Sequence, residues 1–505
     1  MGRVRRTAAP GPVSAAREAR VGPLPSVRAV LVVHGMGQQV RFQALDQIAQ
    51  GLLREAGGST RNPVARTVKI GDDTYQRLEL FLPLPHGGER EVHVYEAYWA
   101  PITEGQVTLR DVTSFLFGAV FNGVRNLGGA LRYSFGRART IWPSFSALIA
   151  LGSAFGVLLT LVAMNGLLVA LAALKGLEPG FVSDSLKASL TGREPALLAI
   201  LAAFSLATLA LLLALAGVEW AKRRTARVRL DGLWRALGAV LQALFLVWLC
   251  STLLAGLAAL VLVSGIGPAS WMRDTFSCAW LDTHWMLPLA ALLLASAAVR
   301  RLFVQYLGDV AAYVTSYKLD RFTAVRNRIK EIARRTAEAL YEATEDAESK
   351  EWAYDGVAIV AHSLGSVVAY DALNALLVDD TVSAEKRDVA ARTRLFLTFG
   401  SPLEKTAFLF ASQAKRTTDT REALVAALQP LISDYGFRPF RWVNVFSRRD
   451  PIGGRLTFYD DSSQPLYRQR RVRNLPDRAA VLPLVAHLEY FSDPVLIRQL
   501  VRALR

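Results

Sequence analysis

A serine on an expected strand-to-helix turn is the first candidate for chemistry in this sequence. The run Ala361-His362-Ser363-Leu364-Gly365 follows a buried apolar strand and precedes an apolar helix. A nucleophilic serine is held on such a turn, where small residues two positions before and after it let the backbone bend without clashes. Ala361 stands where the elbow motif Gly-x-Ser-x-Gly has its first glycine, and it adds only one methyl group. We therefore predict a nucleophile elbow with Ser363 as the nucleophile. The alternative is a serine at an ordinary strand-to-helix turn.

A serine hydroxyl needs a general base, and the base needs an orienting acid. Of the six histidines, only His487 follows the elbow, at the end of an apolar stretch that we expect to be a strand. We expect the side chain of His362 to point away from Ser363, and His34 belongs to a separate loop. His487 is therefore the predicted base, and a solvent-facing histidine is the alternative. The histidines set aside are His86 and His93 in early strands and His284 at the outer end of an apolar run.

The predicted acid is Asp450. It follows an apolar strand at 442–446 and precedes Pro451, which forces a turn. A surface turn aspartate is the alternative interpretation. The competing acids are Glu404, Asp460, Asp461 and Asp493.

A second loop could supply hydrogen-bond donors to a reacting oxygen. His34-Gly35-Met36-Gly37 follows a buried apolar strand. A tetrahedral intermediate needs preorganised N–H groups for its oxyanion. We predict the backbone N–H of Leu364 as one donor and that of Met36 or Gly37 as the other, with His34 and Gly35 supporting the loop. The alternative is a turn that only connects a strand to a helix.

The elements around these residues indicate an α/β fold with a mostly parallel sheet, because buried strands are separated by helical patterns. Neither half of the chain has enough strands alone, so the central block is expected to interrupt one domain. The expected strands are 27–33, 64–70, 76–82, 91–98, 356–360, 394–399 and 442–446, and the expected helices 42–55, 326–348 and 366–377.

The central block is unusually apolar. The chain as a whole is 52% apolar and 20% charged, which excludes a disordered protein. Runs of about 20 apolar residues can cross a membrane, and a buried core helix is the alternative. The runs 141–174, 195–218 and 236–272 contain no charged residue, and 283–299 is borderline. We predict four transmembrane helices at about 144–174, 195–218, 237–265 and 283–303. The flanking segments 112–131 and 302–322 have apolar residues at helical spacing and are interpreted as interfacial helices, with packing against the soluble domain as the alternative.

The basic residues flanking these spans predict that both termini, and with them the active site, lie in the cytoplasm. We therefore expect a protein of the bacterial inner-membrane type. They also explain much of the net charge of +16, because basic residues beside spans meet anionic head groups. Membrane phospholipids are therefore the expected environment and a possible substrate, and no nucleic acid is expected. Two cysteines and no Cys/His cluster of ligand spacing indicate neither disulfides nor a metal, and no cofactor is expected.

The expected organisation has four parts. Residues 1–26 form a basic N-terminal segment without a signal peptide, and 27–110 the first part of the α/β domain. Residues 111–322 hold the interfacial and transmembrane helices, and 323–505 the second part with the elbow.

Three stretches carry a resemblance to a known family: AHSLGSVVAYD at 361–371, FGSPL at 399–403 and NVFSRRDPIG at 444–453. The chain resembles the α/β-hydrolase superfamily, specifically its serine esterases and lipases, with a partial likeness to DDHD-type phospholipases. The resemblance covers 27–98 and 352–495 and suggests a membrane-inserted bacterial member. It implies the order nucleophile, acid, base for Ser363, Asp450 and His487, and a hydrophobic acyl ester as substrate.

The function expected from the sequence is therefore an integral-membrane serine hydrolase that cleaves carboxylic esters, those of lipids above all, through an acyl-enzyme on the cytoplasmic side. A thioesterase or acyl-protein deacylase stays open, because the same triad cleaves thioesters. A non-catalytic membrane scaffold that keeps a hydrolase fold is the alternative from another class. A transporter is disfavoured, because the apolar runs lack the acidic or basic residues that mark ion or substrate paths.

Overall fold

The computed structural model describes most of the chain before residue 105 and after residue 320, and one long helix between them. The expectations for 1–26, for the first span and for most of the third and fourth spans lie outside the described residues. The described segments are 27–37, 39–59, 61–104, 194–225, 320–344, 351–407, 427–433, 438–448, 450, 452–460, 471–477 and 486–505, with single residues between 240 and 313.

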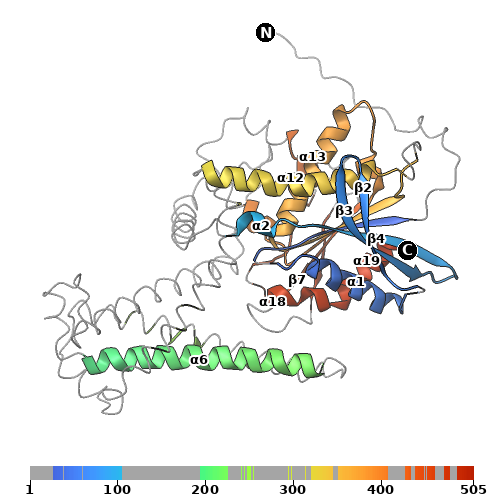
Figure 1. The fold of residues 1–505 in the computed structure, drawn as a ribbon. Helices are drawn as coiled ribbons and strands as arrows, with labels where there is room; N and C mark the ends of the chain where they lie inside the picture. Colours follow the sequence, from blue (N-terminus) through green and yellow to red (C-terminus); the bar gives the residue numbers. More distant parts are fainter. Residues whose placement is uncertain are drawn as a thin grey trace, which may run out of the picture.

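Eight strands form one mixed sheet in the order β2-β3-β4-β1-β5-β6-β7-β8 (Figure 1). From β4 to β8 all neighbours are parallel, whereas β3 is antiparallel to both of its neighbours. The α/β class is thus as expected, in a mixed sheet. The strands are β1 (Arg28–Val33), β2 (Val64–Ile70), β3 (Asp73–Pro83), β4 (Glu89–Ala97), β5 (Gly356–His362), β6 (Thr393–Phe399), β7 (Arg441–Phe446) and β8 (Arg473–Pro476).

Segments from both ends of the chain meet in the middle of this sheet. Strand β1 lies between β4 and β5, and Leu31 is in register with Ile359. Both central strands are almost entirely buried, as their continuous apolar sequences require of parallel strands covered on two faces. Residues more than 300 positions apart therefore pair as neighbours in one sheet.

Helices cover the two faces of the sheet (Figure 1). Helices α12 and α13 pack on one face, and α1 and α19 on the other. The helix bounds are α1 (Gln43–Ala56), α2 (Ala100–Thr103), α6 (Glu194–Thr225), α12 (Asp320–Glu342), α13 (Leu364–Val382), α14 (Val389–Arg392), α17 (Pro430–Ser433), α18 (Ala486–Glu489) and α19 (Pro494–Leu504), with a 3₁₀ turn η4 (Tyr490–Ser492).

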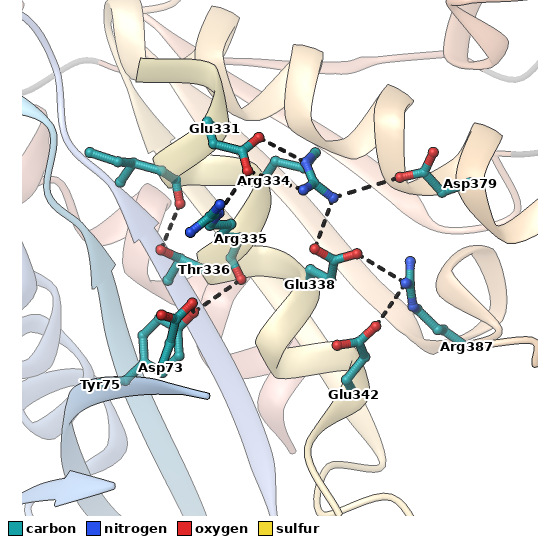
Figure 2. Close-up of polar contacts among 11 residues, drawn as sticks. Asp73, Tyr75, Glu331, Arg334, Arg335, Thr336, Glu338, Glu342, Asp379 and Arg387 are labelled. Carbon is teal, nitrogen blue, oxygen red and sulfur yellow. Dashed lines mark hydrogen bonds and ion pairs between the residues drawn. The ribbon is translucent and has the colours of Figure 1, made fainter. Parts of the chain in front are cut away.

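Helix α12 is fixed from outside by a ladder of charged side chains (Figure 2). Arg334 contacts Glu338 at 2.8 Å and, more distantly, Asp379 of α13 at 3.8 Å. Arg387 contacts Glu338 at 2.9 Å and Glu342 at 2.7 Å. Exposed ion pairs contribute little singly, about 0–1 kcal/mol each. The ladder therefore mainly orients α12 against α13, while the buried apolar face of α12 supplies most of the stabilisation.

The expected transmembrane insertion is contradicted. Within the residues that the structure describes, no helix has the length and apolar character needed to cross a membrane. An α/β-hydrolase fold interrupted by four transmembrane helices is therefore wrong in its transmembrane part. The cytoplasmic placement of the termini and the active site was inferred from those spans and stays a prediction.

Helix α6 shows why the hydropathy pattern misled. It coincides with the second expected span, and its buried side chains include Leu198, Ser205 and Thr208. Trp248 donates from its indole nitrogen to Thr208 Oγ1 over 3.0 Å. Hydropathy sums a run of residues without regard to what each side chain packs against. Part of α6 is buried in this way, whereas its Leu206, Leu209 and Leu213 side chains are exposed.

Candidate active site

Ser363 occupies a strained turn between β5 and α13. Its φ of 51° and ψ of −131° are unusual for a residue with a side chain. Such strain persists only where the surrounding structure enforces it, and it clusters at functional sites. Gly365 shows the enforcement, because a Cβ there would overlap the His34 carbonyl and lie 2.5 Å from the Val33 carbonyl oxygen. The start of α13 is thus pressed directly onto the end of β1.

The structure brings the three expected triad residues together. His487 Nε2 lies 2.7 Å from Ser363 Oγ, and His487 Nδ1 lies 2.9 Å from Asp450 Oδ2. All three are buried, with exposed fractions of 0% for Ser363, 2% for His487 and 6% for Asp450. An ionised carboxylate only accepts, so Nδ1 carries the proton and Nε2 is free to accept from the serine hydroxyl. This arrangement can transfer a proton from serine to histidine.

Asp450 stays ionised in this setting. Burial favours the neutral carboxyl, but the His487 ring and the backbone N–H groups of Gly453 and Ile452 outweigh it and lower the pKa of Asp450 to about 2. Ile452 N donates to Oδ1 over 2.7 Å. A Cβ at Gly453 would overlap Asp450 Oδ2 and the backbone of Gly400, so this turn also depends on a glycine. Asp450 is therefore held as a fixed negative charge beside His487.

The loop of the predicted oxyanion donors lies against the Ser363 turn. A Cβ at Gly35 would come within 2.9 Å of Ser363 Cβ. Met36 is buried, and Gly37 has a φ of 93°, which favours glycine. Leu364 is the first residue of α13, where a helix has N–H groups without intrahelical acceptors. Both expected sources of donors are thus adjacent to the serine.

His34 anchors that loop. Its Nε2 accepts from Trp99 N over 3.0 Å, and its Nδ1 lies 2.8 Å from the Gly35 carbonyl oxygen. The ring stacks on Trp99 with centroids 4.7 Å apart. Burial lowers the pKa of His34 to about 4, so the ring is neutral and Nδ1 donates to Gly35. His34 thus links this loop to the backbone and ring of Trp99.

His362 turns away from the serine hydroxyl and holds the histidine segment instead. Its Nε2 donates to the His487 carbonyl oxygen over 2.8 Å, and its ring stacks on Phe399. Burial, followed by the proximity of His487, lowers the pKa of His362 to about 3. Ala361 is the fully buried penultimate residue of β5 and carries the turn.

The secondary structure around His487 differs from expectation. His487 was expected at a strand end but lies in the short helix α18. The helical turn places Tyr490 three residues later beside Asp450, which an extended strand could not do. The stretch 481–485 before it lies outside the described residues.

The competing acids are engaged elsewhere. Glu404 accepts from Thr457, Asp460 accepts from Val472 N, and Asp493 caps α19. Asp461 and His284 lie outside the described residues. Of the remaining histidines, His86 lies in the turn between β3 and β4, and His93 contacts Glu91 and Tyr354 on the sheet.

Sequence reasoning missed two residues that contact the acid or its turn. Tyr490 Oη donates to Asp450 Oδ2 over 2.8 Å. Lys405 Nζ donates to the carbonyl oxygens of Ile452 and Gly453, at 2.9 and 3.3 Å. Burial lowers the pKa of Lys405 to about 8, although Asp450 opposes the shift. The spacing of three residues between His487 and Tyr490 could have indicated the tyrosine, but nothing in the sequence pointed to the lysine.

One group in the described part of the chain has the spacing of metal ligands. Glu79, Glu91 and His93 offer atoms within 4.8 Å of one another on β3 and β4. Both oxygens of Glu79 already accept from guanidinium groups of Arg66 and Arg77. Two positive charges at the same carboxylate disfavour a cation, so we assign this group no metal.

The fold and the site together define the class: an α/β protein with a hydrogen-bonded Ser-His-Asp arrangement at the carboxyl ends of parallel strands. Comparison with known protein families, curated proteins and solved structures finds no match to this chain.

Proposed function

We propose that this protein is a serine hydrolase of the α/β-hydrolase type that cleaves carboxylic esters through an acyl-enzyme. The observation that carries the proposal is the chain of hydrogen bonds from Ser363 Oγ through His487 to Asp450, at 2.7 and 2.9 Å. The strained backbone of Ser363 supports it, because an ordinary turn serine has no reason to adopt a φ of 51°.

The groups present account for each proton in such a reaction. Ser363 Oγ attacks the ester carbonyl carbon while His487 Nε2 takes the hydroxyl proton. The tetrahedral intermediate collapses, the bond to the alcohol breaks, and His487 gives the alcohol that proton. Water then attacks the acyl-serine with His487 as base again, which releases the carboxylic acid and restores Ser363. Asp450 remains ionised and stabilises the imidazolium at both stages.

The oxyanion would be bound between the two backbone segments that meet at the serine. The N–H of Leu364 is one donor, favoured by the positive end of the helix dipole of α13. The N–H of Met36 or Gly37 is the other. One such donor is typically worth about 3–4 kcal/mol of activation free energy.

The resemblance and the burial of Ser363 support a hydrophobic ester as the substrate. Ser363 has no exposed surface, so a substrate reaches it only by displacing the groups that cover it. A hydrophobic acyl chain, as in a lipid ester, gains free energy by entering such a dry site, at about 25 cal/mol per Å² of apolar surface. We therefore propose acyl esters, membrane phospholipids among them, as substrates.

The proposal is tested by labelling the purified full chain with a fluorophosphonate and by a panel of acyl esters, phospholipid vesicles and acyl thioesters. Wild type and Ser383→Ala, which alters a half-buried serine at the C-terminal end of α13, should label, and Ser363→Ala should not. Turnover of thioesters alone would redirect the proposal to a thioesterase. Unchanged labelling or turnover in Ser363→Ala would refute it.

A further inference from the structure

Tyr490 joins the triad from outside it. The phenol oxygen lies 2.8 Å from Asp450 Oδ2 and 2.8 Å from the backbone nitrogen of Ser447. The side chain is fully buried, one helical turn after His487. It therefore connects the segment that carries the base to the segment that carries the acid.

The direction of the phenol proton is fixed by its neighbours. A phenol has a single proton, and Ser447 N–H can only donate, so the oxygen accepts from Ser447 and donates to Asp450. Oδ2 of Asp450 thus accepts from both Tyr490 and His487, while Oδ1 accepts from Ile452 N. Burial, then the charge of Asp450, holds the pKa of Tyr490 well above its usual range, so the phenol keeps this proton at any working pH.

The ring has little freedom to leave this position. A Cβ at Gly400 would lie 2.8 Å from Tyr490 Cε2 and 3.3 Å from His487 Cε1, so the backbone of this glycine packs directly on both rings. Gly400 has a φ of 56°, which also favours glycine. Phe399 and His362 make further edge and tilted ring contacts with Tyr490.

We propose that Tyr490 is a positioning residue of the triad. It keeps Oδ2 of Asp450 aligned with His487 Nδ1, and through Asp450 it sets the tautomer and orientation of the imidazole. This inference rests on the proposed serine hydrolase function. Tyr490 does not touch the serine, and it acts only through the carboxylate.

The test is Tyr490→Phe in the full chain, with Tyr95→Phe as a matched control. Phenylalanine keeps the ring and its packing and removes only the hydroxyl. Tyr95 is also buried, and its hydroxyl contacts Tyr354 on the sheet at 2.6 Å. Loss of one hydrogen bond to a charged group should lower the second-order rate of fluorophosphonate labelling about ten- to a hundredfold. Tyr95→Phe should label at the wild-type rate.

A double-mutant cycle with Asp450→Asn separates positioning from a general structural role. If Tyr490 acts through the carboxylate, Tyr490→Phe should cause no further loss of labelling rate in the Asp450→Asn background, followed over long incubations.

Three outcomes are distinguishable. Equal labelling of wild type and Tyr490→Phe, with Ser363→Ala unlabelled, overturns the role of Tyr490 and leaves the hydrolase intact. An equal further loss in both backgrounds shows a structural role and overturns it as well. Absence of labelling in a folded wild type refutes the proposed function, and the positioning role with it.

Discussion

Replacing Gly365 with alanine is the sharpest available perturbation of the elbow. The added methyl group would overlap the His34 carbonyl group and lie 2.5 Å from the Val33 carbonyl oxygen. Ordinary contacts of a Cβ atom begin near 3.4 Å. Because the opposing atoms are backbone, no side chain can rotate to make room. The start of α13 must therefore separate from the end of β1 by about 1 Å.

That separation should lower both the activity and the stability of the protein. A misplacement of about 1 Å in a catalytic arrangement costs on the order of a hundredfold in rate. Overpacking in a dense core typically costs about 1–3 kcal/mol of unfolding free energy. In Gly365→Ala, the serine turn would move away from the loop at 34–37 that carries the proposed oxyanion donors. We therefore expect a folded protein with kcat/KM lowered about a hundredfold.

The assay is ester turnover and fluorophosphonate labelling, with circular dichroism to establish the fold. Gly454→Ala is the matched control. It adds the same methyl group next to the Asp450 turn, but a Cβ at Gly454 would meet nothing within 4 Å. The control should retain wild-type activity. Wild-type activity in Gly365→Ala would refute the argument that this contact fixes the elbow against the oxyanion loop.

Three further results are expected. Asp450→Asn should lower kcat roughly 10⁴-fold with the fold intact, because the imidazole of His487 is no longer held in the tautomer with its proton on Nδ1. A loss below tenfold in steady-state turnover would contradict the triad. Burial, then the charge of Asp477, raises the pKa of Asp493 to about 7. Between about pH 4 and 7 the unfolded state therefore loses this proton while the folded state keeps it. The stability of the protein should fall as the pH rises through that window. Asp477→Asn should make Tm fall less steeply with pH in this window. An unchanged slope of Tm against pH would contradict the part given to Asp477. Glu338→Gln removes two ion pairs from α12 and should lower the free energy of unfolding, measured by chemical denaturation, by about 1 kcal/mol. The loss should be smaller in high salt. A loss independent of salt would contradict an ionic origin.

The grouping of Ser363, Asp450 and His487 could be predicted because each residue is marked by a short sequence segment. The elbow at Ser363 has an apolar strand before it and an apolar helix after it, and each pattern is visible within ten residues. The acid at Asp450 was predictable because a buried strand ends shortly before it. His487 was found by elimination, which works when a chain has six histidines.

What could not be predicted depends on contacts between distant segments. Tyr490 contacts Asp450 because α18 and the following turn η4 bring it there, whereas we expected a strand before His487. Strand β8 (Arg473–Pro476) is short, half-exposed and polar, so it lacks the apolar signal of a buried strand. The transmembrane interpretation rested on the composition of apolar runs, and no helix among the described residues has the length and apolar character of a span.

The most direct test of the central claim is to map the fluorophosphonate adduct by peptide mass spectrometry in wild type and in His487→Gln. The account predicts a single adduct on the peptide that contains Ser363, lost or strongly slowed when His487 can no longer accept the hydroxyl proton. An adduct on another serine, or labelling of Ser363 at the same rate without His487, would contradict it.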